Sequence, residues 1–132
     1  MAKGFEHAGA WIEKAKNDLL NADNNLASEQ IPYDTVCFHC QQAAEKLLKA
    51  YLVAHNKAYP ITHNLFTILE YILEYDSTAE NFRESLAILN PYSVEVRYPG
   101  DAWMPAPSDA KEARQAVQEI YNWVKSKLGQ FF

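Results

Sequence analysis

Side chains capable of acid–base and anion-binding chemistry lie in the apolar stretch between residues 37 and 50. Glu45 and Lys49 are four residues apart with the acid first, so on a helix they share one face and can form an ion pair. Helix statistics favour a solvated surface pair for this spacing. The alternative is a polar site. The same stretch has the broadest apolar face of any predicted helix, so its polar groups are expected to lie on the most buried helix.

The cysteines and histidines of this region raise the question of a metal. Cys37, His39 and Cys40 lie close in sequence, but successive helical turns splay these side chains, and no second cluster completes four ligands. We therefore predict no metal site and no cofactor. Two cysteines three residues apart on a helix are also badly placed for a disulfide, so both are expected to be reduced. His39 is expected to be a hydrogen-bonded interior residue, and His63, just before a helix, to cap it or pack against it.

Three short motifs, taken together, resemble the HEPN domain in order and spacing, and the likeness covers nearly the whole chain. They are Gln41-Gln42-Ala43-Ala44-Glu45-Lys46 with Lys49-Ala50, then Thr62-His63-Asn64-Leu65, then Arg97-Tyr98-Pro99. The type it resembles is the small prokaryotic HEPN protein associated with a nucleotidyltransferase. The resemblance implies a helical bundle that forms a homodimer.

Active HEPN proteins, as the resemblance implies, cleave RNA without a metal through an arginine followed four to six residues later by a histidine. A glutamate and a basic residue four apart support that site, and Glu45 and Lys49 match them. Arg97 matches the arginine, but no histidine follows it in the chain. RNA cleavage of this type requires a general base to take the 2′-hydroxyl proton and an acid for the leaving oxygen. Asp101, four residues after Arg97, is a poor acid near neutral pH, and His63 is the other substitute.

The missing histidine favours a second role that the resemblance implies, that of a nucleotide-binding partner of a small nucleotidyltransferase, in a toxin–antitoxin type system. Arg97 and Lys49 would hold a phosphate, Tyr98 and Trp103 would offer stacking surfaces, and the helix start near His63 would add amide donors. The full binding set predicted is Arg97, Tyr98, Lys49, Glu45 and His63. Arg97 forming only a surface salt bridge remains an equal alternative. A metal-independent RNase with Arg97, Asp101 and His63 as catalytic candidates, or a purely structural interaction domain, are the other functions left open.

The elements that must position these residues are all predicted helices. Apolar residues recur at steps of three and four, and Pro and Gly separate the periodic segments. Helices are expected over residues 8–28, from 34 or 35 to about 56, from 62 or 64 onward, from 77 to about 90 and from 108 to 128, with an ordered loop over 91–107 and a frayed end at Phe131 and Phe132. These predict an all-α, antiparallel four- to five-helix up-and-down bundle, with the second helix at its centre.

Length, composition and charge limit the number of domains and the classes of function. The chain has 132 residues, of which 48% are apolar, and a net charge of −5. We expect a single domain over residues 1–132. The negative net charge argues against a protein that binds nucleic acid over its whole surface, although a local basic patch remains compatible with this charge. No signal peptide or bilayer-length apolar run is present, so a cytoplasmic location without membrane contact is predicted.

Overall fold

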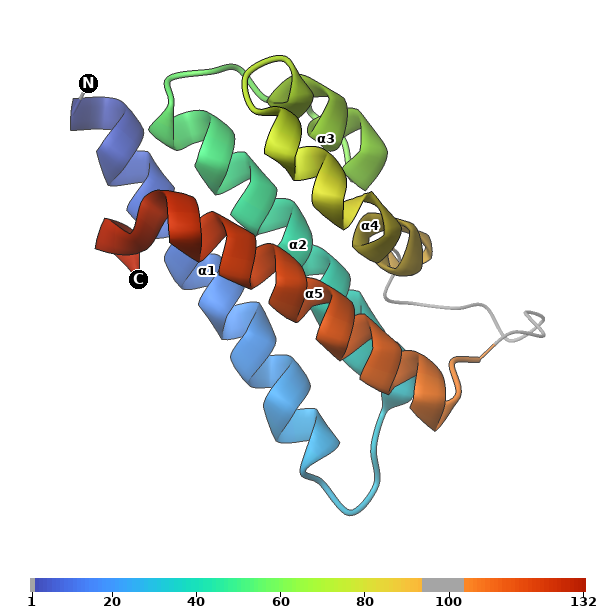
Figure 1. Cartoon of the computed structure of the whole chain (residues 1–132). Helices are drawn as coiled ribbons and strands as arrows, with labels where there is room; N and C mark the ends of the chain where they lie inside the picture. Colours follow the sequence, from blue (N-terminus) through green and yellow to red (C-terminus); the bar gives the residue numbers. More distant parts are fainter. Residues whose placement is uncertain (1, 94–103) are drawn as a thin grey trace.

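The computed structural model describes residues 2–93 and 104–132, with side chains from His7 onward. Within these ranges the regular structure is entirely helical, which confirms the predicted all-α bundle (Figure 1). The elements are α1 (Ala2–Leu26), α2 (Tyr33–Ala54), α3 (Leu65–Leu73), α4 (Arg83–Leu89) and α5 (Pro107–Leu128), with the short 3₁₀ segments η1 (Ser77–Phe82), η2 (Asn90–Tyr92) and η3 (Gly129–Phe131). None of the described helices is long and apolar enough to cross a membrane.

Helix α2 lies at the centre and packs against α1, α3, α4 and α5, as its broad apolar face predicted (Figure 1). Leu47, Leu48 and Leu52 are fully buried and fill the space between the surrounding helices. Ala43 and Ala44, also fully buried, let neighbouring helices approach closely. Any polar group that projects from α2 is therefore surrounded by other elements on several sides.

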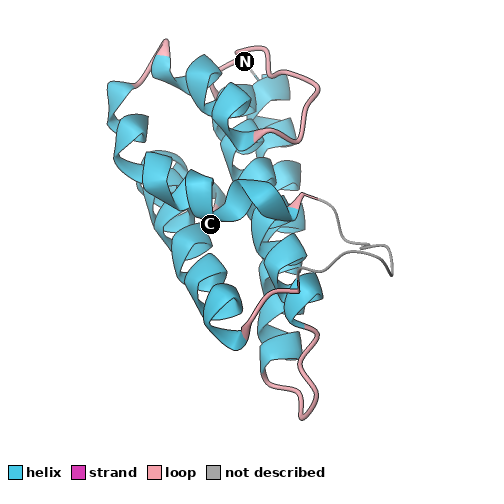
Figure 2. Ribbon diagram, turned by 90° about the vertical axis from the view of Figure 1, so that its right-hand side faces the viewer, coloured by secondary structure: helices cyan, strands magenta, loops and turns pink. Residues whose placement is uncertain are grey.

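The chain reverses sharply at the end of α2. Asn56 takes a left-handed conformation with φ of 56°, which asparagine tolerates better than most residues. Its N–H donates to the Val53 carbonyl at 3.0 Å, and the Lys57 N–H donates to the Leu52 carbonyl at 2.8 Å. These two bonds form a Schellman motif, which satisfies the last carbonyls of the helix. Residues 55–64 then return along α2, because the His63 carbonyl lies against the Gln41 side chain. Figure 2 draws the loops between the helices in pink.

The helix starts differ from prediction at four points. The first helix starts at Ala2 instead of residue 8 and includes Gly4. Pro32, not Asp34 or Thr35, is the N-cap of α2, and its carbonyl accepts from the Val36 N–H at 3.0 Å. The Asp34 carboxylate instead lies in the first turn, where the helix dipole favours negative charge.

The predicted N-caps of η1 and α5 were also wrong. Asp76, not Ser77, caps η1, with its side chain accepting from the Thr78 N–H at 3.0 Å. Ala106, not Ser108, precedes α5, because Pro107 is pre-organised for the first helical position. The prediction for α3 is confirmed, since the Asn64 side chain accepts from the Phe66 N–H at 3.0 Å.

The end of the chain packs on α1, so the frayed end predicted for Phe131 and Phe132 is wrong. Both residues are half-buried. The Lys16 ammonium donates to the Phe132 carbonyl at 3.2 Å, and the Phe132 ring meets the Tyr121 ring edge-on with centroids 5.0 Å apart. Such tertiary partners lie far away in sequence and leave no local signal.

Candidate functional site

One carboxylate, that of Glu45, holds two cationic or ionisable partners. Its Oε2 accepts from the Lys49 Nζ at 2.9 Å, and its Oε1 lies 2.9 Å from the His63 Nδ1. The Glu45 side chain is only 6% exposed and that of Lys49 8%, whereas the His63 side chain is 69% exposed. A buried ion pair therefore carries an imidazole that projects into solvent. We call Glu45, Lys49 and His63 the Glu45 cluster.

The contact between Glu45 and His63 determines which ring nitrogen is available. An ionised carboxylate can only accept hydrogen bonds, so the His63 Nδ1 must carry the hydrogen and donate it. In the neutral ring the Nε2 is then an unprotonated acceptor. A histidine oriented in this way by a carboxylate has the arrangement of a general base, and its protonated form can donate to an anion.

Two aromatic rings enclose the ammonium of Lys49. Its Nζ lies 5.7 Å from the centroid of the Trp11 ring and 5.5 Å from that of Tyr59. The two rings meet edge to face at 5.7 Å. A solvated surface pair, which helix statistics favoured, is therefore wrong for Glu45 and Lys49. Trp11 is half-buried and packs against the edge of the core.

Gln41 fixes the loop that carries His63. Its side chain is fully buried, and its Nε2 donates to the backbone carbonyl of His63 at 3.1 Å. Sequence reasoning noted Gln41 only as part of a motif. The available signal was its position four residues before Glu45, which in turn precedes Lys49 by four, so three polar side chains form one stripe on the most buried helix.

The rest of the predicted site lies outside the described residues. Arg97, Tyr98, Asp101 and Trp103 all fall within residues 94–103. Of the predicted set, the structure thus brings together Glu45, Lys49 and His63.

A second polar cluster connects α1 to α2, closer to the turn between these two helices. The Asp18 Oδ1 lies 2.9 Å from the His39 Nδ1, and its Oδ2 accepts from the Lys46 Nζ at 2.6 Å. The prediction of a hydrogen-bonded His39 is therefore confirmed. Asp18 was not singled out, since an acid between apolar positions of α1 gives no sign that two residues of α2 will meet it. All three side chains are mostly buried, which indicates a role in helix packing.

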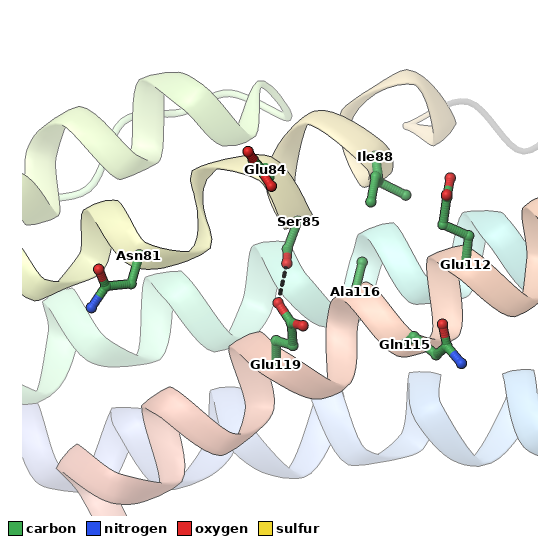
Figure 3. Close-up of a pocket in the computed structure, with 8 residues that line it drawn as sticks. All are labelled: Asn81, Glu84, Ser85, Ile88, Glu112, Gln115, Ala116 and Glu119. Atoms are coloured by element: carbon green, nitrogen blue, oxygen red, sulfur yellow. Dashed lines mark hydrogen bonds between the residues drawn. The ribbon is translucent and has the colours of Figure 1, made fainter.

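A hollow of about 290 Å³ lies between α4 and α5 (Figure 3). Its lining includes the carboxylates of Glu84, Glu112 and Glu119, and Ser85 donates a hydrogen bond to Glu119 at 2.6 Å. Three carboxylates at one opening repel an anion. This hollow is therefore unsuited to a phosphate, in contrast to the surroundings of Lys49 and His63.

The cysteines are buried and form no disulfide, as predicted. Burial raises the pKa of the Cys37 thiol to about 11 and that of Cys40 to about 12. Thiols held in this form are poor nucleophiles and poor metal ligands. Within the described residues, no group of three or more histidine, cysteine or acidic side chains is placed to hold a metal ion.

Comparison with known proteins agrees with the motifs and the helical architecture. A family model of the HEPN domain matches residues 8–127. This chain belongs to the HEPN domain family. No curated protein matches it significantly.

Two solved structures are similar to this HEPN chain over most of their length. TT1696 from Thermus thermophilus is 29% identical, with a TM-score of 0.71 over 91% of this chain and 97% of that one. ST0689, described as an archaeal HEPN homologue, is 25% identical, with a TM-score of 0.69 over 92% of this chain and 97% of that one.

Proposed function

We propose that this HEPN protein is a homodimeric module that binds a nucleotide or an RNA phosphate at the Glu45 cluster and partners a small nucleotidyltransferase in a toxin–antitoxin type system. Arg97 and Tyr98 belong to the proposed binding set because of their place in the sequence motif. The protein is proposed to act as one domain, and its match to the HEPN family over residues 8–127 supports this.

The observation that carries the binding proposal is the exposed imidazole of His63 above a neutralised carboxylate. A lone Glu45 carboxylate would repel a phosphate, but the Lys49 ammonium at 2.9 Å balances its charge. Lys49 is too buried to serve as the main contact, so its contribution is electrostatic. His63 in its protonated form can then donate from Nε2 to a phosphate oxygen, in a charge-assisted hydrogen bond.

Ligand-dependent thermal stabilisation tests the binding proposal. A ligand that binds only the folded state at about 100 times its Kd adds about 2.7 kcal/mol to the free energy of unfolding. AMP and a short single-stranded RNA should raise the Tm of the wild type, and His63→Ala and Arg97→Ala should abolish the rise. Lys125→Ala, which removes an exposed cation from α5, is the matched control. An equal rise in all four proteins would refute binding at this cluster.

The assembly part of the proposal has its own tests. Light scattering should give the mass of a dimer at micromolar concentration, and a monomer would contradict it. Co-expression with a nucleotidyltransferase encoded beside the gene should yield a complex that survives gel filtration. Separate elution of the two proteins would remove the partner role while leaving nucleotide binding untouched.

The orientation of His63 also favours a second candidate function, metal-independent RNA cleavage. The free Nε2 would take the proton of a ribose 2′-hydroxyl, whose oxygen then attacks the adjacent phosphorus. The bond to the 5′-oxygen breaks, and this leaving oxygen takes a proton from a second group, for which Asp101 is the candidate in the sequence. The products would be a 2′,3′-cyclic phosphate and a free 5′-hydroxyl.

Incubation with a mixed RNA substrate in EDTA distinguishes the two functions. Cleavage by the wild type that disappears in both His63→Ala and Arg97→Ala would establish the nuclease. Intact RNA, together with ligand-dependent stabilisation, would support the binding module. Cleavage that persists in both variants would come from a contaminating enzyme and would count against the nuclease.

A further inference from the structure

A small recess on the outer side of α1 adjoins the Glu45 cluster. Its volume is about 200 Å³, and among the described residues it is lined by His7, Ala10, Trp11 and Lys14. Trp11 belongs to both places, because its ring also contacts Tyr59 and lies against the Lys49 ammonium. A molecule in the recess would therefore touch the same indole that borders the candidate phosphate site.

The size and lining of the recess restrict what it can hold. Drug-sized ligands occupy pockets of about 300–1,000 Å³, so a space of this size suits a single small ring system. Its surface is predominantly apolar, and the Trp11 indole provides an aromatic wall. Lys14 contributes a cation, and no carboxylate is present in the described lining, unlike in the hollow between α4 and α5. These features fit an aromatic group attached to an anion.

We infer that the recess binds the nucleobase of the same ligand whose phosphate occupies the Glu45 cluster, so the ligand is a nucleotide or one nucleotide of an RNA. This inference rests on the proposed function and specifies its ligand. The base stacks on Trp11, and stacking accepts every base because each has an aromatic face. Lys14 in the recess lining and His63 of the Glu45 cluster then attract the phosphate.

Calorimetric titration with AMP and with ribose 5-phosphate separates base binding from phosphate binding. Two variants remove the recess in different ways. Trp11→Leu deletes the stacking surface, and Ala10→Leu fills the space from an exposed position with a good helix former. Ala87→Leu, at an exposed position of α4, is the matched control. Stacking of one base corresponds to roughly a tenfold change in affinity.

We expect both recess variants to weaken AMP binding about tenfold or more and Ala10→Leu to leave ribose 5-phosphate binding unchanged. If AMP and ribose 5-phosphate bind the wild type equally well, or if neither recess variant weakens AMP, the recess proposal is overturned while phosphate binding stands. If neither compound binds, the recess proposal and the proposed function fail together. Should Trp11→Leu fail to fold, Ala10→Leu alone decides the result.

Discussion

Replacement of Asp76 by asparagine should make the protein less stable at neutral pH but not in acid. Asp76 connects three elements, since Tyr51 of α2 and Lys127 of α5 both contact its Oδ2, at 3.2 and 3.1 Å. Its Oδ1 accepts from the N–H of Thr78 in η1. Asparagine is an equally good N-cap and keeps the last interaction. The substitution removes the charge, and the amide NH2 that replaces Oδ2 can no longer accept from Tyr51 and Lys127.

The expected magnitude follows from the pKa of Asp76. Burial alone raises this pKa, but hydrogen bonds from Thr78 and Lys127 outweigh burial and hold it at about 2, against an ordinary value of 3.8. The side chain is 14% exposed but lies near the surface, so solvent screens part of the interaction. One pKa unit corresponds to about 1.4 kcal/mol, and the ionised carboxylate therefore contributes about 2 kcal/mol to the free energy of unfolding.

The sign of the pH dependence follows from the direction of the shift. Because the pKa is lower in the folded state, the contribution is complete above the unfolded value of 3.8 and is lost as the pH falls through about 2. Asp76→Asn should thus be about 2 kcal/mol less stable than the wild type at neutral pH. The difference should shrink to nothing in strong acid.

Urea denaturation followed by circular dichroism, repeated from neutral pH down into the acid range, measures this difference. Glu74→Gln removes one carboxylate from an exposed position two residues away and controls for net charge. A difference between Asp76→Asn and the wild type that does not change with pH would refute the reasoning. So would a loss no larger than that of Glu74→Gln.

Three further predictions concern buried polar groups. Lys49→Met should lower the free energy of unfolding by about 3 kcal/mol in urea titrations, because it leaves the buried Glu45 carboxylate without its ammonium. Burial and, secondarily, a nearby carboxylate raise the pKa of Tyr51 to about 12. The wild type should therefore lose stability above about pH 10, where unfolded tyrosine ionises. Tyr51→Phe should lose less stability over this range, in alkaline denaturation followed by circular dichroism. Cys37 and Cys40 should resist iodoacetamide in the native protein at neutral pH and react only after unfolding, as mass spectrometry would show.

Much of the fold could be predicted because helical periodicity and proline breaks are local signals. The central position of α2 followed from its broad apolar face. The ends of helices were harder, since several residues near each boundary can cap. Asp76 and Ser77 are adjacent candidates, and only the extended backbone at Asp76 selects it. The docking of Phe132 on Lys16, across most of the chain, has no local signal at all.

The candidate site was predictable in its members but not in its environment. A spacing of four placed Glu45 and Lys49 on one face. Whether that face is buried depends on Trp11 of α1 and Tyr59 of the returning loop, neither of which the spacing reveals. The pairing of His63 with Glu45 depends in turn on the reversal at the end of α2, which brings the loop back along the helix it has just left.

The fully buried alanines of α2 determine where this protein can change. Ala43, Ala44 and Ala50 sit against neighbouring helices, and a larger side chain there costs about 1–3 kcal/mol. They flank Glu45 and Lys49 in sequence, so selection on packing and selection on the site act on the same short segment. New ligand preferences should therefore arise by substitution in the outer face of α1 and the loop over residues 55–64. In a mutational scan, α2 should tolerate few substitutions, whereas the outer face of α1 and the loop over residues 55–64 should tolerate many.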